Sequence, residues 1–295
     1  MRLHRAQRDQ VGGFVLIAVL SILAMLSGLD LAMQLLSRGS VDTARLESEE
    51  LDIDAIVRSV VALTGYQLFI LKQPGAAVDG QQIRLNQGVA TVSISPEAGK
   101  VDVNGAGKEL LAAVYRVAGL RAMSPESFAA RVIDWRDSDE ELSVEGAEQP
   151  AYGAAGMSSG TRNASFRSPA DLSFVIGVSE ADAMILSEWM TVFNPDGRLD
   201  VFAAPEALIA ELPGMTKDMI DQVLALRRTR TEAAAAGLAD LLLLQSAFIS
   251  TANPRAYLVV ISARLERHDR IRRVELVMAP SVTPVSPYQI VSWRQ

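Results

Sequence analysis

An apolar stretch near the N-terminus, Phe14 to Leu29, contains no charged residue. Its helical pattern continues beyond Asp30 to Leu36, so the segment reaches the ~20 residues that cross a lipid bilayer as a helix. Farther along, aliphatic residues recur at the spacing of one helix face, at Ile53, Ile56, Val57, Val60 and Val61. We therefore predict a single helix to about Leu71, with residues 14–36 in a membrane and the second half on a globular domain.

Patterns that are typical of β-strands flank a long helical region. The expected strands are Ile83–Leu85, Ala90–Ile94 and Lys100–Val103 before it, and Ala256–Ala263, Ile271–Met278 and Ile290–Trp293 after it. Between Ala106 and about Ser250, small residues and few β-branched runs favour helices. We therefore expect an α+β fold. Residues 37–104 and 253–295 form a helix and one antiparallel sheet, and residues 105–252 form an inserted, all-helical domain.

The helical region contains an internal repeat. KVDVNGAGKELL from Lys100 parallels RLDVFAAPEALI from Arg198 at an offset of 98. MSPESFAARVIDWR from Met123 parallels MTKDMIDQVLALRR from Met215 at an offset of 92, and a partial third copy begins at Ser168. In the second pair of segments, a serine or a threonine stands in the N-cap position of the expected helix.

One copy, LIAELPGMTKDMIDQVL from Leu208, has the pattern of a helix-hairpin-helix with Pro213-Gly214 as its turn. In other proteins such a hairpin directs backbone N–H groups at DNA phosphates. We favour the alternative of a compact helix-packing unit, because nearby carboxylates would repel phosphate. These carboxylates belong to Glu206, Glu211, Asp218 and Asp221.

The composition excludes several kinds of site. The chain has no Cys, so it has no disulfide, zinc–thiolate site or thiol nucleophile, and its two histidines, His4 and His268, cannot form a histidine-rich metal site. A net charge of −7 disfavours non-specific binding of nucleic acid. We expect two local charge clusters to be solvated. For the acidic cluster, the alternative is contact with a neighbouring subunit of a polymer. They are Glu47, Glu49, Glu50, Asp52 and Asp54, and Arg264, Arg267, Arg270, Arg272 and Arg273.

A dense run of carboxylates, Asp134–Glu141, is followed by Glu145 and Glu148. Counted from Asp137, oxygen-bearing side chains fall at positions one, three, five, seven, nine and twelve of a calcium loop. Leu142 stands at the sixth position, where an EF-hand requires Gly, so we predict an irregular calcium loop and no EF-hand. A solvated acidic loop is the alternative. Acid–base catalysis is disfavoured, because so hydrophilic a run offers no apolar surroundings to separate two pKa values.

The residues before the apolar stretch carry three basic side chains against one acid, Arg2, Arg5 and Arg8 against Asp9, which favours a cytoplasmic N-terminus. A glycine pair ending at Gly13 precedes the apolar run, whereas a secretory signal has its small residues after that run. This order resembles a class III signal of the type IV prepilin kind, cleaved between Gly13 and Phe14. A plain signal anchor is the alternative. Ala18 stands at the fifth mature position, where such signals usually have Glu.

Several further motifs carry a family resemblance. They are GKVDVNGAGKELL, VIDWRDSDEE followed by EGAEQPAY, RNASFRSPADLSFVIGVS and LDVFAAPEALIAELPGMT. With the signal that lacks Glu, they resemble general secretion pathway protein K, the K-type minor pseudopilins of type II secretion, over about Phe14 to Leu226. Two departures are Gln149, where the family often has an acid, and Phe202-Ala203-Ala204, where it often has Asn-Thr-Ala.

The resemblance implies a pseudopilin fold, a long N-terminal helix plus an antiparallel sheet, with a helical domain inserted between strands. It implies structural calcium at the acidic loop, held by Asp134, Asp137, Asp139 and Glu148. It also implies a non-enzymatic, single-pass inner-membrane protein with a periplasmic C-terminal domain, processed and methylated by the prepilin peptidase. Such a subunit would stand at the pseudopilus tip with the I-type and J-type minor pseudopilins and would assist protein export across the outer membrane.

Two other functions are alternatives to that of a minor pseudopilin in secretion. A DNA-uptake pseudopilin would use the hairpin at Pro213-Gly214 for DNA, but the acidic surroundings count against it. A membrane-anchored hydrolase would use the acidic cluster around Asp137. We expect neither nucleic acid nor a catalytic residue.

Overall fold

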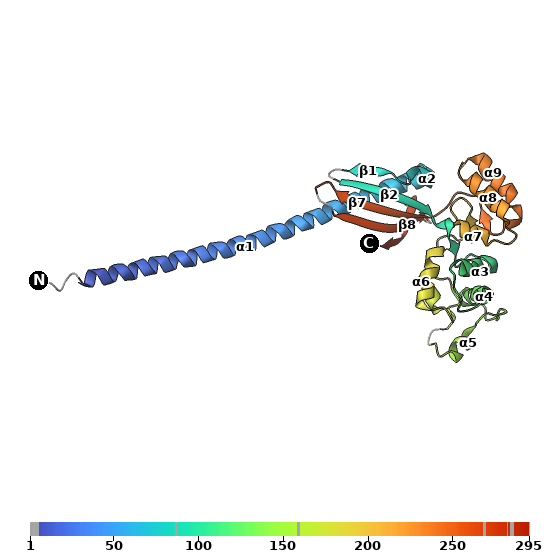
Figure 1. Cartoon of the computed structure of the whole chain (residues 1–295), viewed down its shortest axis with the longest axis horizontal. Helices are drawn as coiled ribbons and strands as arrows, with labels where there is room; N and C mark the ends of the chain where they lie inside the picture. Colours follow the sequence, from blue (N-terminus) through green and yellow to red (C-terminus); the bar gives the residue numbers. More distant parts are fainter. Residues whose placement is uncertain are drawn as a thin grey trace.

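The computed structural model describes residues 6–85, 88–157, 160–229, 231–267, 270–281, 283 and 286–294, with the side chains of residues 6–13 and 35–44 left out. Helix α1, Ala6–Gly65, continues into a π-helical turn, η1 (Tyr66–Ile70), which confirms the long helix expected to about Leu71. Its first half projects from the rest of the molecule as a free rod (Figure 1). The first five residues of the expected leader lie outside the described residues.

A five-stranded antiparallel sheet has the order β1-β2-β7-β8-β9. The strands are β1 Gln82–Leu85, β2 Gly88–Pro96, β7 Tyr257–Leu265, β8 Ile271–Pro280 and β9 Tyr288–Arg294. Alternate residues of β2 and β7 are buried, as expected for a sheet with one covered face. The second half of α1 covers this face, and all five aliphatic residues predicted for its apolar stripe, from Ile53 to Val61, are buried there. A short helix, α2 (Gly75–Val78), connects the π-helical turn to β1.

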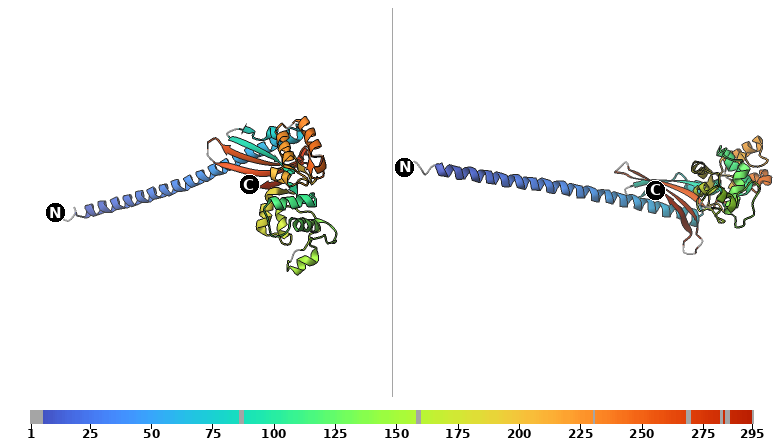
Figure 2. Two further views of the ribbon diagram at one scale, coloured as in Figure 1. Left: turned by 45° about the vertical axis from the view of Figure 1, so that its right-hand side comes forward. Right: turned by 90° about the horizontal axis from the view of Figure 1, so that it is seen from below.

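Residues 97–256, between β2 and β7, pack around a second hydrophobic core. Figures 1 and 2 place them at the end of the molecule away from the N-terminus. Their α-helices are α3 Lys108–Val117, α4 Pro125–Arg136, α5 Gln149–Ala154, α6 Glu180–Trp189, α7 Glu206–Ala210, α8 Lys217–Arg227 and α9 Glu232–Leu241. The described residues of this part also form the 3₁₀ turns η2 Glu97–Gly99, η3 Pro169–Phe174 and η4 Leu243–Gln245.

The expectation that this part is all-helical is wrong. Two pairs of parallel strands hold its helices together: β3 (Val101–Asp102) with β4 (Met190–Thr191), and β5 (Leu199–Asp200) with β6 (Ile249–Ser250). Parallel strands need a crossover connection, which the intervening helices supply. Since β3 pairs with β4 and not with the main sheet, the first strands of that sheet end at Pro96 and not at residue 104.

The internal repeat has a structural counterpart, with one correction to its alignment. Ser124 accepts a hydrogen bond from the Ser127 N–H, and Thr216 accepts one from the Met219 N–H, so the helix starts match at the expected offset of 92. At the other end, Arg136 donates to carbonyls of the β3–α3 turn, whereas Arg227 donates to those of the β5–α7 turn. Helix α8 has 11 residues against 12 in α4, so the matching arginine is Arg227 and not Arg228.

The two charge clusters are partly paired with each other instead of being wholly solvated. Arg270 lies 2.7 Å from Glu50, and Arg272 contacts both Glu50 and Asp54. Sequence spacing could not reveal these pairs, because the partners are 218 to 222 positions apart. They bind the β7–β8 hairpin to α1 at the point where the helix leaves the sheet.

Candidate functional site

The candidate site begins at the C-terminal end of α4, which is anchored from two sides. Trp135 is buried and stacks on Phe166 with ring centroids 4.1 Å apart. Arg136 donates to the carbonyls of Val103 and, at 2.7 Å, Ala106. These two residues belong to the DWRDSD segment, so they anchor its backbone at the start of the acidic loop.

Asp134 is fully buried at the inner side of this loop. Its Oδ2 accepts a hydrogen bond from the Ser143 N–H at 3.3 Å, but its Oδ1 is buried with no hydrogen-bond partner among the described residues. Gly146 lies so close that an added Cβ would stand 1.9 Å from Asp134 Oδ2. The neighbouring Glu145, at a positive φ of 68°, accepts hydrogen bonds from the hydroxyls of Ser124 and Ser127. The loop is thereby folded back over α4.

Glu148, at the far end of the loop, is buried, and neither of its carboxylate oxygens has a hydrogen-bond partner in the described part of the chain. Asp137 Oδ1 is likewise buried without a hydrogen-bond partner among the described residues. Burial raises the pKa of Glu148, and the negative charges of Asp134, Asp137 and Asp139 raise it further. Burial also raises the pKa of Asp137, as do Asp139 and Asp134, while Arg136 opposes them. The negative charges of these carboxylates therefore repel one another. A bound cation would offset both this repulsion and the cost of burying the charges.

The four predicted calcium ligands, Asp134, Asp137, Asp139 and Glu148, thus belong to one electrostatic cluster. Asp139 is the most peripheral, because its side chain is exposed and accepts the Glu141 N–H at 2.9 Å. The described residues contain no group of three Asp, Glu, His or Cys side chains close enough to enclose an ion as they stand. The donor chemistry fits calcium, but the metal site stays a prediction.

Two residues that follow the loop, Tyr152 and Asn163, lie in motifs that carry the family resemblance but were not predicted as site residues. Asn163 has a positive φ of 50°, and its backbone N–H donates to the Trp135 carbonyl at 3.1 Å. Its side-chain Oδ1 is buried without a partner in the described part of the structure. Tyr152 on α5 is buried nearby, and its pKa is raised by burial and then by Asp134 and Glu148. The acidic loop is therefore followed by a short helix, α5, and no local pattern in RNASF predicts the burial of the Asn163 side-chain oxygen.

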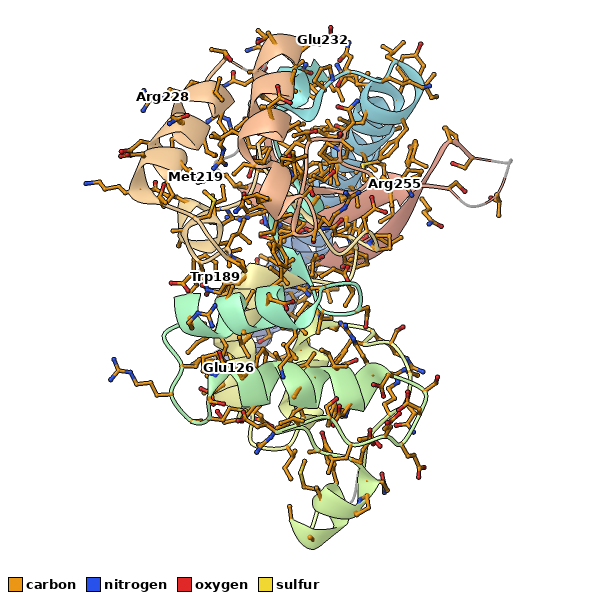
Figure 3. The ribbon with its side chains drawn as sticks, turned by 90° about the vertical axis from the view of Figure 1, so that its right-hand side faces the viewer. Glu126, Trp189, Met219, Arg228, Glu232 and Arg255 are labelled. Carbon is orange, nitrogen blue, oxygen red and sulfur yellow. The ribbon has the colours of Figure 1, made fainter. Side chains whose placement is uncertain are left out.

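The turn of the second candidate site, Pro213-Gly214, is present between α7 and α8, with Gly214 at a φ of 77°. Gln245 Nε2 donates to the Pro213 carbonyl at 2.9 Å, and Glu211 forms an ion pair with Arg116 at 2.7 Å. Figure 3 looks at this end of the molecule, where Met219 lies on α8 and Arg228 directly follows the helix. No observation favours DNA as a ligand of this hairpin.

At the expected prepilin cleavage site, α1 is continuous across Gly13 and Phe14. The side chains before Phe14 lie outside the described set, so the cleavage stays a prediction. The apolar segment Phe14–Gln34 is 21 residues long, and none of its described side chains is buried. A second stretch, Arg45–Ile70, is also long and apolar enough to cross a membrane, but its buried face packs on the sheet.

Comparison with known proteins gave two findings. Residues 89–195, which include β2 from its second residue onward and the whole acidic loop, match the family model of type II secretion system (T2SS) protein K. The fold is similar to a chain in the crystal structure of the GspK-GspI-GspJ complex from the enterotoxigenic Escherichia coli type 2 secretion system, with a TM-score of 0.54 and 13% sequence identity. The alignment covers 85% of this chain and 98% of that chain. No curated protein matches the sequence.

Proposed function

We propose that this chain is a K-type minor pseudopilin of type II secretion, with a non-enzymatic role at the tip of a pseudopilus that assists protein export across the outer membrane. One observation carries the proposal. The long apolar helix is uncovered along residues 14–34, while a bulky part of the molecule lies at the opposite end (Figure 1). Such a helix is suited first to lipid and then to a bundle of similar helices.

The N-terminal helix anchors the precursor in the inner membrane as a single span, with the remainder of the chain in the periplasm. The length of Phe14–Gln34 supports this arrangement, since ~20 apolar residues cross the bilayer core. The prepilin peptidase would cut between Gly13 and Phe14 and methylate the new amino group. If the protein keeps its first thirteen residues in cells with an active prepilin peptidase, this step is wrong.

Residues 97–256 act as a domain inserted between β2 and β7, with hairpins of the helix-hairpin-helix kind as packing units. Their separate hydrophobic core supports this division. The physical argument for a tip position is steric. A helical filament repeats one subunit at a small axial step, and a side mass of this size would obstruct the next subunit in each position.

Calcium is proposed as the structural ion of the acidic loop. Asp134, Asp137, Asp139 and Glu148 would hold it, with a positive charge that compensates the buried, unpartnered oxygens. Magnesium suits the loop less, because it keeps several waters and takes few protein carboxylates. Thermal unfolding of residues 40–295 with calcium and with chelator tests the site, since a ligand of the native state raises the midpoint with its concentration. An unchanged midpoint in chelator rules the ion out.

The partners proposed for this chain are the I-type and J-type minor pseudopilins, together with other pseudopilins of the filament. The similar structure is a complex that contains GspI and GspJ, and this supports the choice. Co-production of the full chain with I-type and J-type pseudopilins, followed by co-purification from the inner membrane, tests it. Gold labelling of isolated pseudopili should mark one end only, and label along the shaft would contradict the tip position.

A further inference from the structure

The main sheet has two edge strands, which differ in how they are protected from further pairing. Strand β1 is only four residues long and contains Arg84, which pairs with Glu266 after β7. Strand β9 is seven residues long, and its first six residues, YQIVSW, include no charged residue and no proline. Short length, charges and proline are among the features that stop an edge strand from pairing. Strand β9 lacks all three over these six residues.

The apolar side chains of β9 are only half covered. Ile290 and Trp293 lie opposite Met278 and Leu276, which belong to the core under α1. Residues opposite each other on neighbouring strands face the same side of a sheet. Met278 and Leu276 are buried, whereas Ile290 is 40% and Trp293 41% exposed. The core therefore ends at β9 with an apolar margin, which one further strand would cover. Figure 1 shows the C-terminus, which follows β9, at the border of the sheet.

The backbone of β9 is directed outward at Ile290. In an antiparallel strand, the N–H and C=O groups of successive residues are directed alternately to the neighbouring strand and away from it. Tyr288 lies opposite Pro280, which has no N–H, and the Tyr288 carbonyl accepts the hydroxyl of Ser286 at 2.6 Å. Tyr288 thus directs its groups away from β8, and Ile290, two positions later, does the same. In the described part of the chain no strand pairs with β9 on this side.

At its C-terminal end, β9 borders a cleft of about 270 Å³ between the sheet and the helical part of the chain. Ser292 and Arg294 line the cleft from β9, and Ser168 and Ser187 line it from the helical part. A segment that extends the sheet beside β9 would therefore reach this cleft with one of its ends.

The charges in the cleft favour an acidic ligand. Its two carboxylates are already engaged, because Glu97 accepts a hydroxyl and Glu275 pairs with Arg273 at 2.8 Å. Lys100 and Arg294 also line the cleft, and neither forms an ion pair with a carboxylate among the described residues. Two cations without a counterion, beside engaged carboxylates, are complementary to a negatively charged group.

We infer that β9 pairs with an extended segment of a neighbouring minor pseudopilin, and that an acidic end of this segment enters the cleft at Lys100 and Arg294. Only an extended backbone satisfies the outward groups of an edge strand in series. The inference rests on the proposed function, which supplies the partner, and it adds strand addition as the mode of binding. A second copy of this chain suits the edge less. Because α1 runs roughly along the strands (Figure 1), antiparallel pairing of two β9 strands would direct the two rods away from a common membrane.

Ile290→Pro tests the backbone pairing, with Ile290→Ala as its matched control. Both variants lack the isoleucine side chain, but only proline lacks the N–H. Proline is tolerated in an edge strand where that N–H faces outward, so the β8–β9 ladder should persist. The full-length variants are co-produced with I-type and J-type minor pseudopilins and purified from the inner membrane. We expect Ile290→Pro to recover about tenfold less partner than Ile290→Ala, with equal thermal midpoints.

Two failures of this experiment are distinguishable. If both variants recover partner equally, pairing at β9 is wrong and the proposed function stands. If the unaltered chain recovers no partner, the proposed partners fail together with the inference. The acidic end has its own test, in which Arg294→Glu should lower the recovery of partner severalfold and Arg228→Glu, also at an exposed position, should not. Equal recovery with these two variants contradicts the acidic end.

A photo-cross-link provides a second measurement that does not depend on how the proline variant folds. The chain has no cysteine, so a benzophenone can be attached at Val291→Cys alone, where the valine is 38% exposed. The control is Leu244→Cys on η4, where the leucine is 89% exposed. We expect adducts with a co-produced minor pseudopilin from position 291 and none from position 244. An adduct of twice the mass of this chain, or no adduct from position 291, overturns the inference.

Discussion

Asp102, the last residue of β3, is buried, and its carboxylate accepts the backbone N–H groups of Asn104, Gly105 and Asn194 at 2.7 to 2.9 Å. Burial raises the pKa of this carboxyl, against the lowering effect of these three N–H groups and of Arg136. The residue joins the β3 turn to the chain after β4, more than ninety positions away. Its ionisation is therefore coupled to the folding of the second core.

The pH dependence of stability should report this raised pKa. The folded protein keeps the Asp102 proton to a higher pH than the unfolded chain, whose ordinary pKa is 3.8. At pH values between the unfolded and the folded pKa, the folded state binds more protons than the unfolded chain. The free energy of unfolding therefore falls as the pH rises through this range, and it levels off above the folded pKa. Asp102→Asn removes the titration. Urea unfolding from about pH 4 to about pH 7 should show wild type losing stability relative to this variant. A constant difference contradicts the expectation.

Gly146 provides a second prediction at this scale. A Cβ there would stand 1.9 Å from Asp134 Oδ2, so Gly146→Ala must displace either the loop or the carboxylate. We expect a loss of about 1–3 kcal/mol in the free energy of unfolding, as for other overpacked sites. The control is Gly153→Ala on α5, where nothing lies within 4 Å of the added Cβ and the change should be neutral or slightly stabilising. Denaturant unfolding of both variants measures the difference, and equal stability would refute this account of Gly146.

At the scale of elements, α4 and α8 play matching parts in two copies of one arrangement. Each has a hydroxyl N-cap and ends with an arginine that donates to the turn after a short parallel strand. Ser124 and Thr216 were recognisable from the sequence, because capping is a local interaction. The match between Arg136 and Arg227 was not, since it depends on where each helix ends against its strand.

This register makes a prediction about two neighbouring arginines. Arg227 donates to the carbonyls of Phe202 at 3.0 Å and Ala204 at 2.7 Å, whereas Arg228 is exposed. Arg227→Met should cost about 2 kcal/mol or more, because it leaves two carbonyls without their donor. Arg228→Met should change the free energy of unfolding by less than about 0.5 kcal/mol. Urea titrations compare the stabilities of the two variants. Equal losses would indicate that Arg228, at the offset of 92, is also equivalent to Arg136.

At the scale of the whole molecule, two hydrophobic cores share one chain. Among the described residues, the core under the sheet contains none of the segment 97–256, and the second core contains none of the sheet. The segment leaves and returns at adjacent points, because Pro96 pairs with Tyr257 in the β2–β7 ladder. Each core therefore excludes water from its own set of side chains.

Removal of residues 97–256 should leave a folded sheet. If Pro96 and Tyr257 are joined by an Asn-Gly turn, β2 and β7 become an ordinary hairpin in the same register. We expect cooperative thermal unfolding and a β-rich circular dichroism spectrum from residue 40 onward. A shortened chain that unfolds without cooperativity would show that the sheet needs the second core.

Much of the fold followed from local patterns. The stripe from Ile53 to Val61 and the strands of the main sheet were predicted, because periodicity reports which side chains a helix or strand buries. Of the short strands β3 to β6, β4 and β6 were not predicted, since a strand of two residues shows too little periodicity. Of the candidate site, the sequence indicated the carboxylates but not Asn163 or the close approach of Gly146 to Asp134.

The sequence by itself determined the rod, the alternation of the strands, the helix caps and the acidic composition of one loop, because each depends on residues within a few positions of one another. Only the tertiary structure decided that Arg272 binds Glu50 and Asp54, and that Asp134 Oδ1 and both carboxylate oxygens of Glu148 are buried without hydrogen-bond partners among the described residues. It alone decided that Leu46 is left outside the sheet while Ile53 is inside. Whether a side chain loses contact with water depends on which distant segments fold over it. The spacing of residues along the chain does not specify those segments.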